Sequence, residues 1–359
     1  MLYRESGLFH TSYAADQAVF PIPLDRMAIV VFAVIAVVAI PMFGNEWFLS
    51  TIMLPFLIFS LAAIGLNILT GYCGQLSLGT GGFMATGAFA AFKLSTAFPD
   101  LHIVIVLFAS GLIAALVGIA FGLPSLRIKG FYLAVATLAA QFFLIWMFNK
   151  YGWFTNYSAS GVISAPPREV FGDVIVTSSQ ASLEARYLFA LAIVVVLAIA
   201  AKNMARSRIG RMWMAIRDMD IAAEIMGMRP LPTKLSAFAV SSFYCGIAGA
   251  MWAFLHTGTV EPLAFDVNRS FQILFMVIIG GLGSILGSFF GAAFIVLLPI
   301  VLNNAPGWLG YQVPTDLLSH VEFMIFGVLI VFFLIVEPAG LARLWQIGKE
   351  KLRRWPFPY

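Results

Sequence analysis

Charged side chains are scarce in this sequence of 359 residues. Asp, Glu, Lys and Arg make up 11% of it, against about 25% in soluble domains. Hydrophobic residues make up 61%, and the mean hydropathy is +0.95. This composition excludes an ordinary soluble domain and indicates a chain embedded in a lipid bilayer. The net charge of +4 does not indicate nucleic-acid binding, because basic cytoplasmic loops alone make many membrane proteins positive.

Patterns for catalysis and metal binding are also missing. The two cysteines, Cys73 and Cys245, stand in apolar or glycine-rich surroundings and form no C-x-x-C pair. The sequence contains no G-x-x-x-x-G-K-[ST], H-E-x-x-H or G-x-S-x-G pattern. We therefore predict no catalytic site, metal site or cofactor in this chain. Its apolar runs hold almost no ionisable residue, which disfavours an ion-coupled carrier. If the protein moves a solute uphill, the energy comes from another chain.

Long apolar runs dominate what remains, and several can cross a hydrocarbon core of about 30 Å. The run 271–302 is too long for one straight helix, which would measure about 48 Å, so we predict a hairpin broken at "GGLGS", with two short halves. The sequence thus predicts an all-α polytopic membrane protein with about ten membrane segments. The apolar runs cover residues 27–43, 48–69, 78–94, 101–123, 131–148, 187–201, 235–256, 271–302 and 321–336.

Lysine and arginine set the predicted orientation, because they concentrate in cytoplasmic loops. Arg26 precedes the first run, and Arg127 and Lys129 separate the fourth from the fifth. We predict a cytoplasmic N-terminal segment 1–26, a transmembrane domain 27–338 and a cytoplasmic basic tail 339–359. Within the domain, residues 149–186 form an external loop and residues 202–234 a strongly basic cytoplasmic loop. The first 26 residues lack the pattern of a signal peptide, so we expect the first span to be retained.

Two glycine-rich passages interrupt the apolar runs, "GYCGQLSLGTGG" at 71–82 and "GGLGS" at 280–284. Non-helical backbone at membrane depth is tolerated only where protein or a water-filled cavity satisfies it, and transporters place broken helices at the substrate route. The candidate translocation residues are therefore Gly71, Gln75, Ser77, Gly79, Gly280, Gly281 and Gly283.

Close helix packing is the alternative role for these glycines. Gly283, Gly287 and Gly291 repeat at the spacing of a packing face, and for them packing and pathway lining both stay open. Gly118 and Gly122 have the same spacing and favour packing. Gln75 and Ser77 carry polar groups that are costly to leave unpaired in hydrocarbon, which indicates a pathway or an interhelical hydrogen bond.

One polar and basic passage, "RMWMAIRDMDIAAEIMGMRPLPTK" at 211–234, lies between two apolar runs. Its pattern predicts an amphipathic helix over 211–228 that ends at Gly227 in the left-handed conformation, with "RPLP" preventing continuation. Such a helix can receive mechanical work from a cytoplasmic partner. It can equally lie on the anionic inner leaflet.

Three blocks of the sequence resemble one family. These are "AAEIMG" followed by "LPTKLSAFAVSSFYCGIAGAMWAF", then "GYCGQLSLGTGGFMATGAFAAF" and "FQILFMVIIGGLGSILGSFFGAAF". They resemble the permeases of ABC importers of the branched-chain amino acid type, the LivM-like subfamily. The resemblance implies a transmembrane subunit, without an ATPase site of its own, that translocates branched-chain or other small hydrophobic amino acids across the bacterial inner membrane. It also implies a second related permease, two cytoplasmic ATPases that bind ATP and Mg, and an extracytoplasmic solute-binding protein.

The same resemblance assigns the ATPase-coupling residues. Ala222, Ala223, Glu224 and Gly227 would form the docking helix, and Glu224 or Arg217 would make charge-assisted contacts with the ATPase. The broader signature reads Glu-Ala-Ala, whereas here the two alanines precede the glutamate, and Thr80 stands where the family often has histidine. Urea or short amides are alternative cargo for the same class of importer. A stand-alone carrier or channel is the alternative class, and a membrane-embedded enzyme is disfavoured.

Overall fold

The computed structural model describes residues 11–12, 23–125, 131–158, 160–169, 177, 181–308, 315–337 and 339–354. Arg127 and Lys129, on which the predicted orientation partly rests, lie outside these ranges, as does most of segment 1–26.

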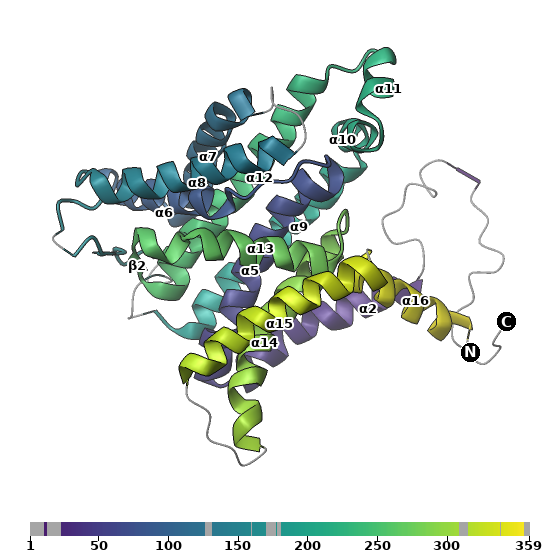
Figure 1. Cartoon of the computed structure of the whole chain (residues 1–359). Helices are drawn as coiled ribbons and strands as arrows, with labels where there is room; N and C mark the ends of the chain where they lie inside the picture. The colour runs from purple at the N-terminus through teal and green to yellow at the C-terminus, as the bar shows by residue number, and fades with distance from the viewer. Residues whose placement is uncertain are drawn as a thin grey trace.

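Nearly all of the described chain is helical, as the apolar runs predict (Figure 1). The elements labelled η are short π-helical turns, except η5, which is a 3-10 turn. In order, the elements are α2 (Pro23–Val34), η1 (Ile35–Ala39), α3 (Ile40–Phe43), α4 (Glu46–Phe48), η2 (Leu49–Met53), α5 (Leu54–Asn67), η3 (Ile68–Tyr72), α6 (Thr80–Ala97), α7 (Ile103–Ser125), α8 (Phe131–Lys150), β1 (Ile163–Ser164), α9 (Leu183–Arg206), α10 (Arg208–Asp218), α11 (Asp220–Ile225), α12 (Pro230–Met251), η4 (Trp252–Thr257), β2 (Thr259–Val260), η5 (Pro262–Phe265), α13 (Val267–Gly280), α14 (Ile285–Trp308), α15 (Thr315–Val336) and α16 (Gly340–Arg354).

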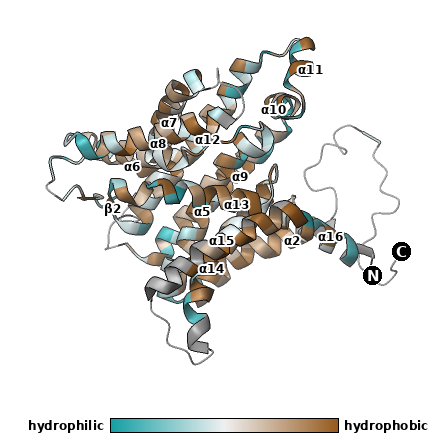
Figure 2. Cartoon of the chain, in the orientation of Figure 1, coloured by the Kyte–Doolittle hydropathy of each residue, from teal (hydrophilic) through white to brown (hydrophobic). Residues whose placement is uncertain are grey.

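Seven helical stretches in the described chain are long and apolar enough to cross a membrane. The chain is therefore an all-α polytopic membrane protein, as predicted; the count of about ten segments stays a prediction. Brown, hydrophobic residues dominate the long helices, and teal, hydrophilic residues lie on α10, α11 and α16 and at the ends of other helices (Figure 2). The stretches span Glu46–Tyr72, Ile103–Ser125, Tyr132–Lys150, Leu183–Arg206, Pro230–Thr257, Pro262–Gly280 and Ile285–Asn304.

The centre of the molecule is formed by the stretches Glu46–Tyr72 and Pro230–Thr257. The most apolar 18 residues of these stretches are 89% and 83% buried, whereas those of Ile285–Asn304 are only 28% buried. Helix α12 packs against α5, α6 and α7. Small residues allow this close approach: a β-carbon on Gly87 would lie 2.0 Å from the carbonyl oxygen of Gly246.

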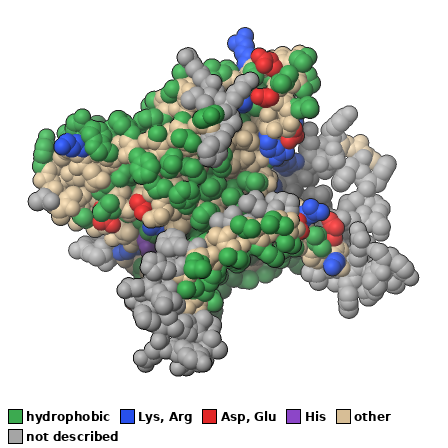
Figure 3. All heavy atoms as spheres, viewed as in Figure 1, with side chains coloured by type: hydrophobic (Ala, Val, Ile, Leu, Met, Phe, Trp, Pro, Cys, Tyr) green, Lys and Arg blue, Asp and Glu red, His purple; other side chains and the backbone are tan. Residues whose placement is uncertain are grey.

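The helices leave a broad apolar surface on the outside. The space-filling view shows hydrophobic side chains covering the faces of α7, α8 and α15, with charged side chains gathered towards the ends of the molecule (Figure 3). Leu116 on α7 and Phe142 on α8 are 66% and 59% exposed. Exposed apolar area of this extent suits contact with lipid or with another subunit.

Two ends of the molecule differ in structure. At one end, α10 and α11 project beyond the long helices (Figure 1). At the other, β1 pairs antiparallel with β2, with Ile163 opposite Val260. Lys93 near the end of α6 lies over the ring of Trp153 at 4.4 Å and donates to Asn156, as an interfacial anchor does.

The predicted hairpin is broken where the sequence indicates, but its halves are not both short. α13 ends at Gly280 and α14 begins at Ile285, and α14 continues for 24 residues. A helix of that length measures about 36 Å, enough to cross the core by itself. The expectation of two short halves is therefore wrong for the second half.

Candidate functional site: the joined helix breaks and the α10–α11 segment

The first glycine-rich passage contains a non-helical segment, residues 73–79, between η3 and α6, and the second separates α13 from α14. Gly74, Gly281 and Gly283 adopt positive φ angles of 71°, 118° and 76°, which glycine tolerates without steric cost. Both predicted interruptions are therefore confirmed, and each leaves backbone groups outside the helical ladders.

Asn67, at the end of α5, satisfies the backbone of the second break. Its side-chain Nδ2 donates to the carbonyl oxygen of Ser284 at 2.8 Å and to Ser288 Oγ at 3.0 Å. Its Oδ1 accepts from the backbone N–H of Gly283 at 2.8 Å. Asn67 is 1% exposed, so these bonds replace water that cannot reach the site.

The two breaks touch at Gly71 and Gly283. A β-carbon on Gly71 would lie 2.0 Å from Asn67 Oδ1 and 2.2 Å from the backbone nitrogen of Gly283. Only glycine fits there without displacing backbone. The structure thus brings together two passages that lie more than two hundred residues apart in sequence.

Arg217, in the last turn of α10, binds this junction from outside the membrane helices. Its Nη1 donates to the carbonyl oxygen of Gly71 at 2.9 Å, and its Nε donates to Asp218 Oδ1 at 2.9 Å. A β-carbon on Gly74 would lie 2.8 Å from Arg217 Cγ. The guanidinium therefore links the α10–α11 segment to the first helix break.

The predicted amphipathic helix over 211–228 is two helices, which corrects the sequence-based expectation. Met219 is extended (φ −156°, ψ 96°) and separates α10 from α11. Gly227 is left-handed with φ 88°, as predicted. Backbone N–H groups of Gly227 and Met228 donate to the carbonyls of Glu224 and Ala223, the bonding pattern of a Schellman motif. Arg229 is extended (φ −95°, ψ 107°) before Pro230, as residues that precede proline usually are. Pro230 itself starts α12, at a position where its missing N–H costs nothing.

Helix α11 exposes its apolar side chains. Ala223 is buried, Ala222 is half-buried and Glu224 is exposed. A short segment so exposed has no partner for its apolar surface within the described chain. We call this surface the α11 apolar patch: it consists of Met219, Ile221, Ile225 and Met226, which are 70%, 70%, 83% and 69% exposed.

The start of α6 is held by side chains from α8 and α13. Gly81 N donates to Ser270 Oγ at 2.8 Å, and Gly82 N donates to Gln141 Oε1. Gln141 Nε2 in turn donates to the carbonyl oxygen of Phe265 at 2.7 Å. These bonds satisfy N–H groups that the first turn of a helix leaves free. Sequence reasoning did not identify Gln141 or Ser270, although a glutamine inside an apolar run was a usable signal.

The remaining predicted pathway residues lie along the same passage. Ser77 is 1% exposed and accepts from Gly79 N at 3.3 Å, so its hydroxyl bonds locally rather than between helices. A β-carbon on Gly79 would lie 2.9 Å from the carbonyl oxygen of Thr137. Gln75 is 5% exposed, and its Oε1 has no hydrogen-bond partner in the described chain.

Glycines of the second break also serve helix packing. β-Carbons on Gly280 and Gly291 would lie 2.1 Å and 1.8 Å from the carbonyl oxygens of Gly287 and Met276. A β-carbon on Gly118 would lie 2.2 Å from Ser242 Oγ. The packing interpretation thus holds for Gly287, Gly291 and Gly118.

Arg269 is an ionisable residue in a candidate span that sequence reasoning did not identify. It belongs to the stretch Pro262–Gly280, and its guanidinium lies 4.9 Å from the ring centroid of Phe59 and 4.6 Å from that of Trp252. Phe59 is the central residue of the span Glu46–Tyr72. Arg269 also donates to the carbonyl oxygen of Ala264 and to Gln272 Oε1, so aromatic faces and oxygen acceptors compensate its charge.

Comparisons with known proteins identify the family. Residues 48–334 match the family described as "Branched-chain amino acid transport system / permease component". The LivM permease proteins of the high-affinity branched-chain amino acid transport systems of Salmonella typhimurium and Escherichia coli are each 28% identical over 306 residues, which cover 79% of this chain and 68% of the relative. A probable LivM permease of Methanocaldococcus jannaschii is 24% identical over 334 residues, 82% of this chain and 92% of the relative. No solved structure matches the chain significantly. Because the family match spans most of the sequence and the fold is a polytopic helical one, the chain belongs to the family of permease components of branched-chain amino acid transport systems.

Proposed function

We propose that this chain is the transmembrane subunit of an ATP-driven importer for branched-chain or other small hydrophobic amino acids. Family membership and the names of the relatives support the amino-acid cargo. The sequence has no phosphate loop of its own, so ATP and Mg would be bound by two partner ATPases. The observation that carries the proposal is the α10–α11 segment, which joins an exposed apolar patch to a bonded helix break.

In this proposal, α11 docks into the ATPase. The α11 apolar patch would be covered by the partner, and the exposed Glu224 would make a charge-assisted contact. Ala222 and Ala223 would allow close approach, with Ala223 facing this chain's own core. Gly227 would let the backbone leave the docking site through its left-handed turn.

Arg217 would carry movement of the docked segment to the membrane helices. A displacement of α10 acts on Gly71 through the 2.9 Å hydrogen bond and, through the contact of Gly71 with Gly283, on the second break. Packed breaks of this kind rearrange between discrete arrangements rather than deform continuously. Gly71, Gln75, Ser77, Gly79, Gly280, Gly281 and Gly283 are thus proposed to line or move the translocation pathway.

The proposed orientation places α10, α11 and both termini in the cytoplasm of a bacterial inner membrane. Helix α16 starts beside the second break, because a β-carbon on Gly340 would lie 2.6 Å from Gly281 N. Arg217 lies close to the same break, because a β-carbon on Gly283 would lie 3.4 Å from its Nη1. Helix α16 of the basic tail and the basic loop 202–234 would therefore share one side, which the positive-inside rule assigns to the cytoplasm. Loop 149–186 and the β1–β2 pair would face the solute-binding protein, and the exposed helix faces would meet a second, related permease.

A stand-alone carrier is the second candidate, and Arg269 is the observation that favours it. Intramembrane cations often mark transport pathways. The oxygen acceptors and aromatic rings around Arg269 give it a structural role, however, and the importer class is preferred. Urea or short amides are alternative cargo within that class.

Site-directed cross-linking in native membranes tests the docking surface. A Cys-to-Lys cross-linker on an Ile225→Cys variant should capture an ATPase subunit, whereas the same linker on Leu263→Cys should not. Both positions are exposed, at 83% and 73%, but Leu263 lies in η5, near the β2 end. Capture by both variants, or by Leu263→Cys alone, would contradict docking at α11.

A further inference from the structure

A polar cavity of ≈ 320 Å³ lies between the first helix break and the α10–α11 segment. Residues 73–75 form one side of it, the end of α10 and the start of α11 another, and Lys234 of α12 a third. Its volume is at the lower end of the range for ligand pockets, about 300–1,000 Å³. The cavity therefore suits a small molecule.

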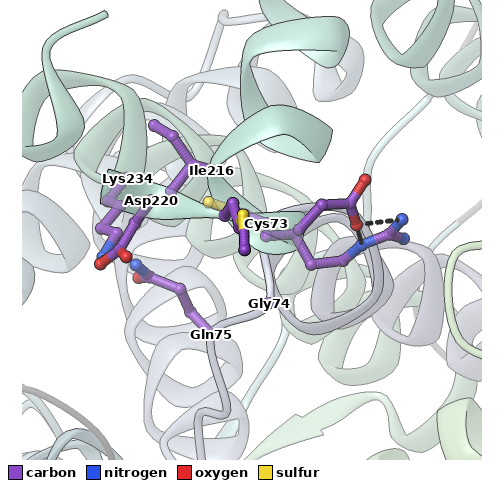
Figure 4. A pocket seen from close by; sticks show the side chains of 9 residues that line it. Cys73, Gly74, Gln75, Ile216, Asp220 and Lys234 are labelled. Carbon is purple, nitrogen blue, oxygen red and sulfur yellow. Dashed lines mark hydrogen bonds and ion pairs between the residues drawn. The ribbon is translucent and has the colours of Figure 1, made fainter. Parts of the chain in front are cut away.

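Gln75 presents an unsatisfied acceptor to this cavity. The residue is 5% exposed, and its Oε1 has no partner among the described residues. The side chain points towards Asp220 and Lys234 (Figure 4). A buried amide oxygen left unpaired costs free energy that a donor from a ligand would recover.

Asp220 and Lys234 bring opposite charges to the same wall. Their Oδ2 and Nζ atoms lie 3.8 Å apart, beyond the usual hydrogen-bond distance of about 2.7–3.2 Å. Each group thus keeps capacity for a second partner. Arg217 also lines the cavity, but its guanidinium is engaged by Asp218 and Gly71, which leaves Lys234 as the cation for an incoming anion.

We propose that this cavity binds a free zwitterionic amino acid on the cytoplasmic side. The ligand's ammonium would donate to Gln75 Oε1 and Asp220, and its carboxylate would accept from Lys234. Ile216 and Met219 on the wall would contact an aliphatic side chain. The assignment to the cytoplasmic side rests on the proposed function, and the ligand belongs to the same class as the proposed cargo.

Occupancy of the cavity has a mechanical consequence. Gln75 belongs to the passage that continues from Gly71, whereas Asp220 begins the docking helix α11. A ligand that joins them restrains the α11 segment against the first break. Cytoplasmic amino acid at high concentration would therefore slow the transport cycle.

Direct binding to the full chain with its co-purifying subunits tests the proposal. The complex is placed in nanodiscs of phosphatidylcholine and phosphatidylglycerol, so that no primary-amine headgroup competes, and radiolabelled leucine is added without binding protein. We expect saturable binding that Lys234→Gln and Gln75→Leu each weaken by about tenfold. Arg229→Gln removes the same charge from an exposed position outside the cavity and should change affinity by less than about twofold.

Leucine analogues test the same site on the unaltered protein, so the result does not depend on whether a variant folds. Leucinamide lacks the carboxylate and N-acetylleucine lacks the ammonium, so each should compete with leucine about tenfold less well. Absence of saturable binding, competition by either analogue as strong as that by leucine, or equal effects of Lys234→Gln and Arg229→Gln would overturn the proposal. ATP-dependent uptake that persists in such a case would leave the proposed importer function standing.

Discussion

Arg217 Nη1 donates a hydrogen bond to the carbonyl oxygen of Gly71 at 2.9 Å. One partner belongs to the segment proposed to contact the ATPase, and the other to the junction of two helix breaks. This bond is a direct connection from a surface element to η3, the last turn of a candidate span before the non-helical segment.

Replacing Arg217 with glutamine should uncouple ATP hydrolysis from transport. The side chain is 38% exposed, so the loss in stability should be modest, about 1 kcal/mol after allowance for solvent screening. Transport per ATP hydrolysed should fall severalfold while membrane insertion is retained. Arg229→Gln in the same basic loop is the control, and equal transport per ATP in both variants would contradict the coupling role of Arg217.

Gly71→Ala should destabilise the junction. The added β-carbon would lie 2.0 Å from Asn67 Oδ1 and 2.2 Å from Gly283 N, so the backbone must shift at a cost of about 1–3 kcal/mol. A lower midpoint of thermal aggregation in detergent should reveal this. Gly327→Ala is the control and should leave the midpoint unchanged, because no atom lies within 4 Å of its added β-carbon. An unchanged midpoint for Gly71→Ala would mean that the breaks do not touch.

Asn67→Leu should reduce both stability and transport, although leucine and asparagine are similar in size. It would leave the N–H of Gly283 without its side-chain acceptor and remove the donor to Ser284 and Ser288. An unpaired buried polar group costs about 1–3 kcal/mol. We expect reduced thermal stability and lost transport. Asn67→Asp keeps the acceptor for Gly283 and should retain more stability, and the reverse order of the two variants would contradict this bonding scheme.

Gly227→Val should impair transport more than insertion. Gly227 has φ 88° and no neighbouring atom within 4 Å of a β-carbon, so the cost is backbone strain alone, of order 1–3 kcal/mol for a β-branched residue. Gly227→Asn should recover much of the activity, because asparagine tolerates left-handed geometry. Uptake by Gly227→Val at the level of the parent chain would remove this turn from the mechanism.

Cys73 should react slowly and with a shifted pH dependence. Burial raises the pKa of the Cys73 thiol to about 12, and the nearby Lys234 charge lowers it by less. Because the thiolate is the reactive form, alkylation of the folded chain should rise about tenfold per pH unit from pH 7 to 10 without a plateau. In the denatured chain the rate should level off above about pH 8.5. Mass spectrometry distinguishes Cys73 from Cys245, and a plateau in the folded chain would contradict the burial of Cys73.

The sequence predicted the class of fold and both helix breaks, because apolar run length and glycine clusters are local signals. It did not predict that Asn67 bonds Gly283 and Ser284, since the register between distant helices depends on packing of the whole molecule. A lone asparagine inside an apolar run was the available clue. Met219 is extended and divides α10 from α11, but no neighbouring glycine or proline in the sequence predicts this break.

Arg269 illustrates the same limit for charge. It stands just before an apolar run, so hydropathy alone assigns it to a boundary. Only the positions of Phe59 and Trp252 bring it beside the middle of a neighbouring span. Tertiary contact, rather than sequence position, places this charge against the aromatic side chains of neighbouring spans.

We propose that this permease obtains its energy from partner ATPases. Uptake of radiolabelled leucine into proteoliposomes tests it most directly, with the complete complex, the binding protein on the outside and either ATP or a non-hydrolysable analogue inside. We expect accumulation with ATP and none with the analogue, and loss of accumulation when the binding protein is omitted. If the purified chain alone, without ATP, took up as much leucine as the complete complex with ATP, the ATP-driven mechanism would be contradicted. The chain would then be a carrier or channel.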